Sequence, residues 1–198
     1  MKGDLQAMMT RRQFAVCLAT ATGLMATLAR PSASLAGAGD GFRFVFDGFD
    51  GKPLPLSRFR GRAVLVVNTA SKCGYTGQYA GLEKLWQEFG PRGLTIVGVP
   101  SNDFGSQEPL QGEAIKNFCS LNFGVTFPLA DRTPVTGDAA HPFYKWARET
   151  AGDGAIPKWN FHKILLGPGG AVAATFPSPV TPDAAVLQNA ITAALPRS

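Results

Sequence analysis

The amino-acid sequence predicts an α/β domain with a central mixed β-sheet flanked by helices. The chain has 198 residues, of which 45% are hydrophobic and 17% charged, a size and composition that suit one compact domain. Two segments, Ala63 to Val67 and Leu94 to Val99, are mostly apolar without alternation, as expected for strands covered on both faces. A helical segment separates them, so the two strands form a parallel pair with a right-handed crossover.

The elements before this crossover unit are short. Three phenylalanines occupy alternate positions near the start of the domain, Phe42, Phe44 and Phe46. This alternation predicts an early strand or hairpin, and Asp50-Gly51 supplies a turn. The first buried strand then leads directly into a loop that carries Cys73.

The crossover helix is predicted over 76–89, where apolar residues recur at three- and four-residue spacing. Gly90-Pro91 ends it. The segments after the second buried strand predict a helix from Gln111 to Leu121, a short strand from Phe127 to Ala130, and a helix from His141 to Arg148.

A hairpin and a final helix close the domain. The hairpin strands are predicted over Trp159 to Leu166 and Val172 to Phe176, and a glycine-rich turn joins them. The final helix is predicted to begin with Thr181 as N-cap and Pro182 in its first turn, and to continue through Leu195. A strand-helix-strand unit followed by a hairpin and a last helix is the order of a thioredoxin-like fold with extra elements inserted.

The first 38 residues have the features of an export signal, which leaves 39–198 as the mature domain. The segment TRRQF at 10–14 precedes a mildly apolar stretch at 15–29 that is shorter than the roughly 20 residues needed to span a bilayer. Paired arginines before such a stretch resemble twin-arginine signals. We therefore expect a twin-arginine-type signal peptide, a periplasmic location and no stable membrane anchor. A disordered basic N-terminus remains the alternative.

The net charge of +5 comes largely from this N-terminal segment. Four basic residues lie there, Lys2, Arg11, Arg12 and Arg30. The other lysines and arginines are interspersed with acids and form no basic stripe, so we exclude nucleic acid as a partner.

Removal of the signal leaves two of the three cysteines, Cys73 and Cys119, because Cys17 lies within the signal. A structural disulfide is the default explanation for such a pair in an exported domain. Cys73 lies between a buried strand and a helix, where backbone N–H groups and the helix dipole favour a thiolate. Position alone supports a reactive and an inert Cys73 about equally.

Three separated motifs resemble the signatures of one family. The segment NTASKCGYTGQY at 68–79 closely resembles the active-site signature of glutathione peroxidases. SNDFGSQEP at 101–109 resembles the second signature of that family, and KWNFHK at 158–163 the third. The resemblance implies a thioredoxin-like fold and a peroxidase that reduces hydrogen peroxide and organic or lipid hydroperoxides to water or alcohols.

Carried over residue by residue, the resemblance implies a catalytic tetrad of Cys73, Gln107, Trp159 and Asn160. A thiolate that attacks a peroxide oxygen expels an alkoxide or hydroxide that must be stabilised or protonated. Two side-chain amides and an indole N–H are neutral donors suited to both charges. Taken alone, Trp159, Asn160 and Gln107 each fit a structural role better than a catalytic one: a core aromatic, a turn residue and a solvated loop residue.

The resemblance also implies that Cys119 is the resolving cysteine, which condenses with the Cys73 sulfenic acid to form a disulfide. Members of this two-cysteine type are recycled by a thioredoxin-like protein and do not rely on glutathione. A helical Cys119 is expected to lie away from Cys73 in the reduced protein, so resolution should require local unfolding of its helix.

Two residues depart from the family pattern. Ser101 replaces a cysteine that many members carry, and Asp103 replaces a usual glutamine and introduces a charge close to the site. The segment 131–158 is too short for the insertion of tetrameric members, so we expect a monomer. The resemblance calls for no cofactor, and His141 and His162 lack metal-ligand spacing with the cysteines.

Two rival functions remain open at the level of sequence. A peroxide sensor or thiol relay that oxidises a partner protein needs the same two cysteines. A binding or structural module with a permanent Cys73–Cys119 disulfide is the alternative from another class.

Overall fold

The computed structural model describes residues 40–197. A four-stranded mixed sheet with the order β4-β3-β5-β6 lies at its centre. The strands are β3 (Ala63–Thr69), β4 (Leu94–Pro100), β5 (Lys163–Leu166) and β6 (Val172–Phe176). β3 and β4 are parallel, whereas β5 is antiparallel to both β3 and β6. The predicted parallel pair, the mixed sheet and the α/β class are confirmed.

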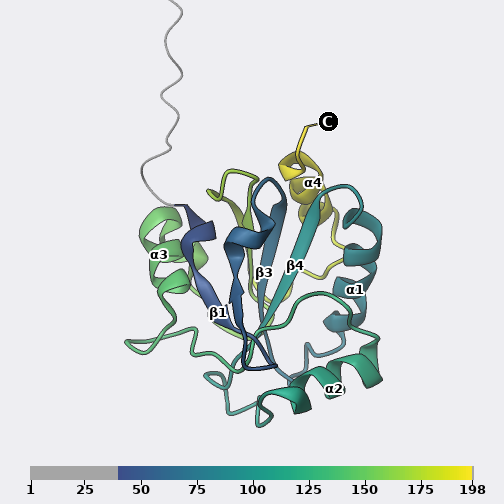
Figure 1. Cartoon of the computed structure of the whole chain (residues 1–198), viewed down its shortest axis with the longest axis vertical. Helices are drawn as coiled ribbons and strands as arrows, with labels where there is room; N and C mark the ends of the chain where they lie inside the picture. Colours follow the sequence, from purple (N-terminus) through teal and green to yellow (C-terminus); the bar gives the residue numbers. More distant parts are fainter. Residues whose placement is uncertain (1–39, 198) are drawn as a thin grey trace, which may run out of the picture. The chain divides into compact units, whose positions relative to one another are not determined.

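Both faces of this sheet are covered, which explains the uninterrupted apolar runs of its central strands. One face packs against α1 (Gln78–Phe89), α2 (Glu113–Phe123) and α4 (Ala185–Ala194), through residues such as Leu65 of β3. The other packs against α3 (Pro142–Ala151) and the hairpin of β1 (Val45–Asp47) and β2 (Pro53–Pro55), through residues such as Val66. Figure 1 shows α3 and β1 on one side of β3 and β4 and α1 on the other.

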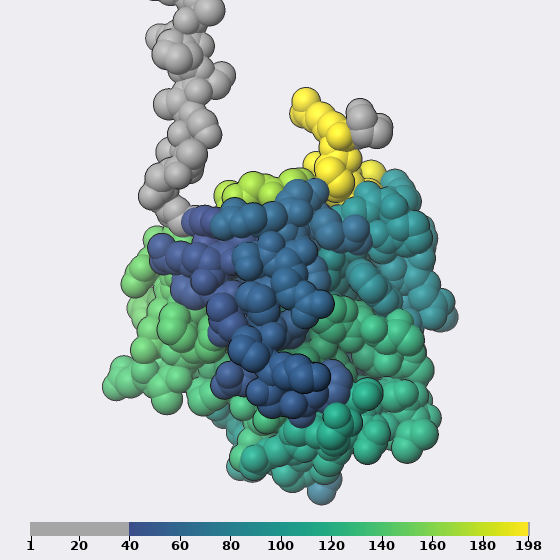
Figure 2. Space-filling view, in the orientation of Figure 1, coloured from purple at the N-terminus to yellow at the C-terminus, as the bar shows by residue number. Residues whose placement is uncertain are grey.

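The N-terminal hairpin agrees with the sequence prediction, with one difference. Phe42 lies in a 3-10 turn, η1 (Gly41–Arg43), and only then does the chain enter β1. Asp50-Gly51 forms the predicted turn, in which the N–H of Gly51, with a φ of 72°, donates to the carbonyl of Gly48. Figure 2 shows this segment and the following η2 (Leu56–Phe59), in purple and dark blue, spread over one face of the domain.

One predicted strand and the predicted start of the final helix are wrong. Phe127 to Ala130 makes only two isolated bridges, Gly48 with Ala130 and Gly98 with Leu129, because Pro128 has no N–H to donate to a ladder. The final helix begins at Ala185 and has no side-chain N-cap.

Thr181 fails as the cap of that helix because its carbonyl accepts the N–H of Ala184 in a separate turn. Pro182 is buried and lies against α1, where a Cβ on Gly81 would come within 3.0 Å of its ring.

Several element boundaries differ from their predicted positions by one or more residues. α2 starts two residues later than predicted, because Gly112 adopts a φ of 54° and donates its N–H to the Asp131 carboxylate at 2.7 Å. α3 continues to Ala151 and leads into η3 (Gly152–Ala155). β5 starts at Lys163, because Phe161 has a φ of 66° and residues 159–162 form a turn. That last difference positions the candidate site.

Within residues 40–197 no helix combines the length and the apolar character that a membrane crossing requires. The predicted signal peptide lies outside the described residues.

Candidate active site

The three sequence motifs meet at one edge of the sheet. β3 and β4 are parallel, so their carboxyl ends lie together, and β5 runs the other way and begins at the same edge. Cys73 follows β3, Gln107 follows β4, and Trp159 and Asn160 precede β5. Such an edge is where open α/β sheets place their ligand sites.

Cys73 lies in a tight loop just before α1. Its side chain is 9% exposed, and the backbone N–H of Tyr75 donates to its Sγ over 3.4 Å. The Thr76 hydroxyl accepts the N–H of Cys73 at 3.0 Å and lies 2.7 Å from the carbonyl oxygen of the same residue. The loop therefore fixes the sulfur and directs a backbone N–H donor at it.

The other predicted site residues are linked to this loop and to one another. The N–H of Lys72 donates to the carbonyl of Gln107 at 2.9 Å. The amide of Asn160, which is fully buried, donates to Oε1 of Gln107 at 3.0 Å. Trp159 is 40% exposed, and its ring centroid lies 5.7 Å from that of Phe104. The structure thus brings the Cys73, Gln107 and Asn160 segments together and leaves an exposed indole beside them.

The Glu108 carboxylate links the segment that carries Gln107 to the loop that carries Cys73. This residue was missed in the sequence analysis. It is 1% exposed and accepts both the backbone N–H and the hydroxyl of Ser71, at 3.0 and 2.8 Å, and the N–H of Leu110 at 3.3 Å. Burial raises the pKa of Glu108 above its usual value, and its hydrogen bonds offset part of that rise. Its position directly after Gln107 in the second motif was the available signal.

The turn that carries Trp159 and Asn160 is held from two sides. Asn68, at the end of β3, accepts the N–H of Phe161 at 2.6 Å and donates its side-chain amide to the carbonyl of Trp159 at 3.0 Å. Lys163 donates from Nζ to the carbonyl of Phe161 at 2.8 Å. These bonds hold Phe161 in the left-handed region, which is unfavourable for a residue with a side chain.

Lys163 is an unusual cation because it is fully buried. Besides the carbonyl of Phe161, its ammonium group contacts Oε1 of Gln78 at 2.7 Å, the first residue of α1. Burial lowers the pKa of Lys163 to about 7. Burial, and next the charge of Lys163, lower the pKa of the adjacent His162 to about 4.

Cys119 lies on the buried face of α2, is 1% exposed and is a free thiol, as is Cys73. Both belong to the same apolar cluster. Burial raises the pKa of Cys119 to about 11. The neighbouring Tyr79 hydroxyl offsets part of that rise, although it lies outside normal hydrogen-bond geometry. Cys119 is therefore a protonated, enclosed thiol in this state.

The two departures from the family pattern have local structural roles. Ser101 is fully buried, and its Oγ accepts the N–H of Asp103 at 3.4 Å. The Asp103 carboxylate accepts the backbone N–H groups of Val135 and Thr136 at 2.6 and 2.9 Å. The charge of Asp103 is thus engaged by a neighbouring loop.

Lys72, which directly precedes Cys73, is exposed and makes no side-chain hydrogen bond within residues 40–197.

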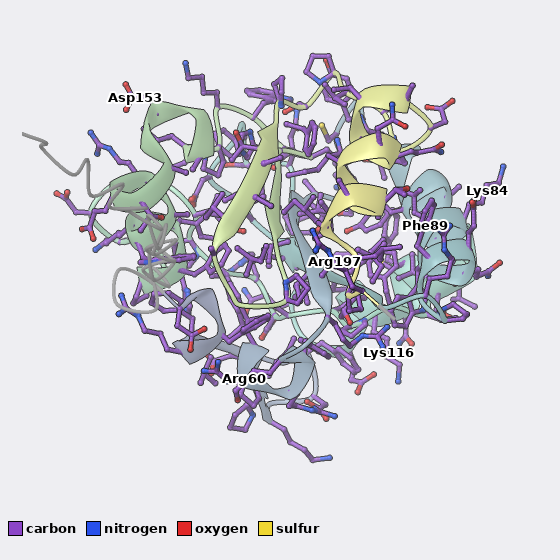
Figure 3. The ribbon with its side chains drawn as sticks, turned by 90° about the horizontal axis from the view of Figure 1, so that it is seen from above. Arg60, Lys84, Phe89, Lys116, Asp153 and Arg197 are labelled. Carbon is purple, nitrogen blue, oxygen red and sulfur yellow. The ribbon has the colours of Figure 1, made fainter. Side chains whose placement is uncertain are left out.

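Over the same range, no group of three or more His, Cys, Asp and Glu side chains could hold a metal ion. Of the charged side chains labelled in Figure 3, those of Lys84 and Asp153 lie at the outer edge of the view.

With this geometry established, comparisons with known proteins identify the family. The family model for glutathione peroxidase matches residues 42–148. This chain belongs to the glutathione peroxidase family. A glutathione peroxidase-like peroxiredoxin of Chlamydomonas reinhardtii is 47% identical, over 67% of this chain and 83% of the relative. A hydroperoxy fatty acid reductase of Synechocystis is 43% identical, over 72% and 89%. The chain is a thiol-dependent peroxidase of this family.

Solved structures agree on the fold. The apo crystal structure of Trgpx is 35% identical, with a TM-score of 0.64 over 80% of this chain and 96% of its own. The crystal structure of T. cruzi GPX1 is 25% identical, with a TM-score of 0.61 over 78% and 94%. The predicted thioredoxin-like fold is confirmed.

Proposed function

We propose that Cys73 is the peroxidatic cysteine of this peroxidase. Its thiolate attacks one oxygen of a hydroperoxide, so that an S–O bond forms as the O–O bond breaks. The second oxygen leaves as alkoxide or hydroxide and takes up a proton, giving an alcohol or water and a Cys73 sulfenic acid. The observation that carries this proposal is the buried Cys73 sulfur with the Tyr75 N–H donating to it.

Gln107, Trp159 and Asn160 complete the site by supplying neutral donors. Because Oε1 of Gln107 accepts from Asn160, the Gln107 amide group keeps both of its N–H donors for the sulfur or the departing oxygen. Trp159, which is 40% exposed, carries an indole N–H on the segment before β5. Fixed donors of this kind stabilise charge that develops in the transition state without changing their own protonation.

Cys119 is the resolving cysteine of the proposal. Its sulfur attacks the Cys73 sulfenic acid, an S–S bond forms, and water leaves. Burial of the thiol and its raised pKa, to about 11, mean that α2 must open before Cys119 can react. Ile115 and Cys119 of α2 are fully buried, and Phe118 and Phe123 pack partly buried against the same core. The opening therefore exposes these four side chains.

A thioredoxin-like protein then reduces the disulfide, and glutathione is the less suitable reductant. The peroxiredoxin names of related proteins support this choice. Substrates are hydrogen peroxide and organic or lipid hydroperoxides, and a relative named as a hydroperoxy fatty acid reductase supports the lipid class.

We further propose that the protein acts as a monomer in the periplasm after removal of a twin-arginine-type signal at 1–38. The Arg11-Arg12 pair and the mildly apolar segment after it support the signal. The short segment between Asp131 and Lys158 supports the monomer. Export through a reporter fusion of 1–38, compared with Arg11→Lys plus Arg12→Lys, tests the signal.

Peroxide consumption with a thioredoxin reducing system tests the cycle. We expect turnover in the wild-type protein, none in Cys73→Ser, and a stop after one equivalent in Cys119→Ser. If Cys73→Ser consumed peroxide at the wild-type rate, the assignment of the nucleophile would be wrong.

A further inference from the structure

A groove of about 650 Å³ opens beside the proposed active site. Its walls come from four places: the loop between β3 and α1, the segment from η3 to the turn before β5, strand β6, and the loop after β6. Its residues include Tyr75, Ile156, Trp159, Thr175 and Pro177. This volume is within the usual range for a site that holds a small organic molecule.

The groove is continuous with the surroundings of Cys73. Tyr75 lines it, and the N–H of the same residue donates to the Cys73 sulfur. Trp159 lines it too and directly precedes Asn160, which bonds to Gln107. A molecule whose peroxide group is at Cys73 can therefore extend along the groove.

Most of the exposed surface of the lining is apolar. Ile156, Trp159 and two exposed prolines, Pro177 and Pro179, contribute to it, whereas the buried lining residues His162 and Ser178 are polar. His162 is neutral near pH 7, because burial and its charged neighbour lower its pKa to about 4. The charged lining residues, Lys158 and Asp153, are both exposed.

We propose that this groove binds the hydrocarbon chain of a long-chain organic hydroperoxide while its peroxide group lies at Cys73. The inference rests on the proposed function of Cys73. Hydrogen peroxide would leave such a volume unused. A polypeptide segment would need partners for its own N–H and C=O groups, but the carbonyl of Ser178 in the groove already accepts the amide of Gln78 at 2.8 Å. A hydrocarbon chain has no such requirement.

Thr175→Tyr tests the groove because it fills it from β6 with a residue that favours strands. Ala173→Tyr is the matched control, since Ala173 lies on the same strand, is exposed and does not line the groove. Pro177→Trp, at an exposed lining position after the strand, is the second filling variant.

The rate of Cys73 oxidation is measured in single turnovers of the reduced protein, once with linoleic acid hydroperoxide and once with hydrogen peroxide. Both filling variants should lower the apparent second-order rate constant for the lipid about tenfold, the factor for losing the burial of about two methylene groups. The rate with hydrogen peroxide should change less than twofold, and Ala173→Tyr should match the wild-type protein with both.

Calorimetric binding of linoleic acid, which carries no peroxide, provides a readout that does not depend on activity. Binding to the wild-type protein that both filling variants weaken is the expected result, and it tests the groove even if the protein consumed no peroxide. Equal losses with both peroxides, or no loss in either filling variant, would overturn the proposal. So would an unchanged lipid rate accompanied by slower reduction of the disulfide by thioredoxin, because the groove would then serve the reductant.

Discussion

The two cysteines lie in regions of opposite character. The Cys73 loop is fastened by hydrogen bonds to Glu108, Thr76 and Gln107. Cys119 lies on a helix with no side-chain N-cap, with two fully buried residues and with Leu121 86% exposed. Peroxide attack therefore takes place at a site fixed by hydrogen bonds, beside a helix that is held mainly by apolar packing of Ile115, Cys119, Phe118 and Phe123.

The largest effect on stability and on the rate of Cys73 oxidation is expected when the hydrogen bonds that hold the Cys73 loop are removed. Glu108→Ala removes the acceptor of the Ser71 N–H and hydroxyl, and donors left without partners cost about 1–3 kcal/mol. We expect the free energy of unfolding to fall by about 2 kcal/mol and Cys73 oxidation by hydrogen peroxide to slow at least tenfold. Denaturant unfolding and single-turnover kinetics measure the two effects. Oxidation at the wild-type rate would show that this fastening is irrelevant to the chemistry.

The second effect concerns the helix that carries Cys119. Gly124 ends α2 with a φ of 65°, and a Cβ added there would meet no atom within 4 Å, so Gly124→Ala strains only the backbone, by about 1 kcal/mol. Disulfide formation after one equivalent of peroxide should become about fivefold faster if opening of α2 limits it, with the oxidation of Cys73 unchanged.

Gly137→Ala is the matched control for this change. Gly137 has a φ of 68° and equally open surroundings, but lies in a loop away from α2. Quenched-flow samples separated without reductant give the rate of disulfide formation. A faster rate in both variants, or in neither, would break the link between opening of α2 and resolution.

The third effect is the pH dependence of stability that comes from Lys163. Burial lowers its pKa from 10.5 to about 7, so above pH 7 the unfolded chain binds more protons at this group and stability rises with pH up to about 10.5. Below pH 7 the cost of the buried charge is fully present. Lys163→Met should flatten the rise between pH 7 and 8.5, where the slope is at most about 1.4 kcal/mol per unit.

Urea unfolding of both proteins at pH 7.0, 7.5, 8.0 and 8.5 measures that slope. The window ends there because the raised pKa of Cys119, about 11 against 9.0, acts in the opposite direction at higher pH. Parallel curves for the two proteins would contradict the placement of a titrating ammonium group in the core.

The smallest effect is expected at Asp103, near the fixed region but not part of it. Asp103→Asn weakens two backbone hydrogen bonds of the 135–136 loop, which should cost about 1 kcal/mol of stability. Single-turnover oxidation of Cys73 should remain within twofold of the wild-type rate. A tenfold change would show that the carboxylate charge reaches the site.

Much of the central sheet could be predicted because its signals are local. β3 and β4 are apolar at most successive positions, and the apolar residues of α1 recur at helical spacing. The strand-helix-strand order therefore predicted that β3 and β4 are parallel. The strand at 127–130 failed because Pro128 has no N–H to donate to a ladder, a signal that the sequence carried. The Thr181 cap failed because Pro182 packs against α1, a tertiary contact that periodicity does not record.

The residues of the candidate site also fall into those that the sequence predicted and those that it did not. Cys73, Gln107, Trp159 and Asn160 were named from motifs, whereas Glu108, Asn68 and Lys163 were missed. Their function lies in contacts between segments far apart in sequence, such as the 91-residue separation of Asn68 from Trp159. The burial of Lys163 could not be expected from composition, because lysine is almost never fully buried without a partner.

The most direct test of the account is mass spectrometry of the reduced mature domain after one equivalent of hydrogen peroxide. We expect a single Cys73–Cys119 disulfide in the wild-type protein, and in Cys119→Ser a Cys73 sulfenic acid that a dimedone-type reagent traps. An unmodified Cys73 in both proteins after the peroxide has been consumed would contradict it.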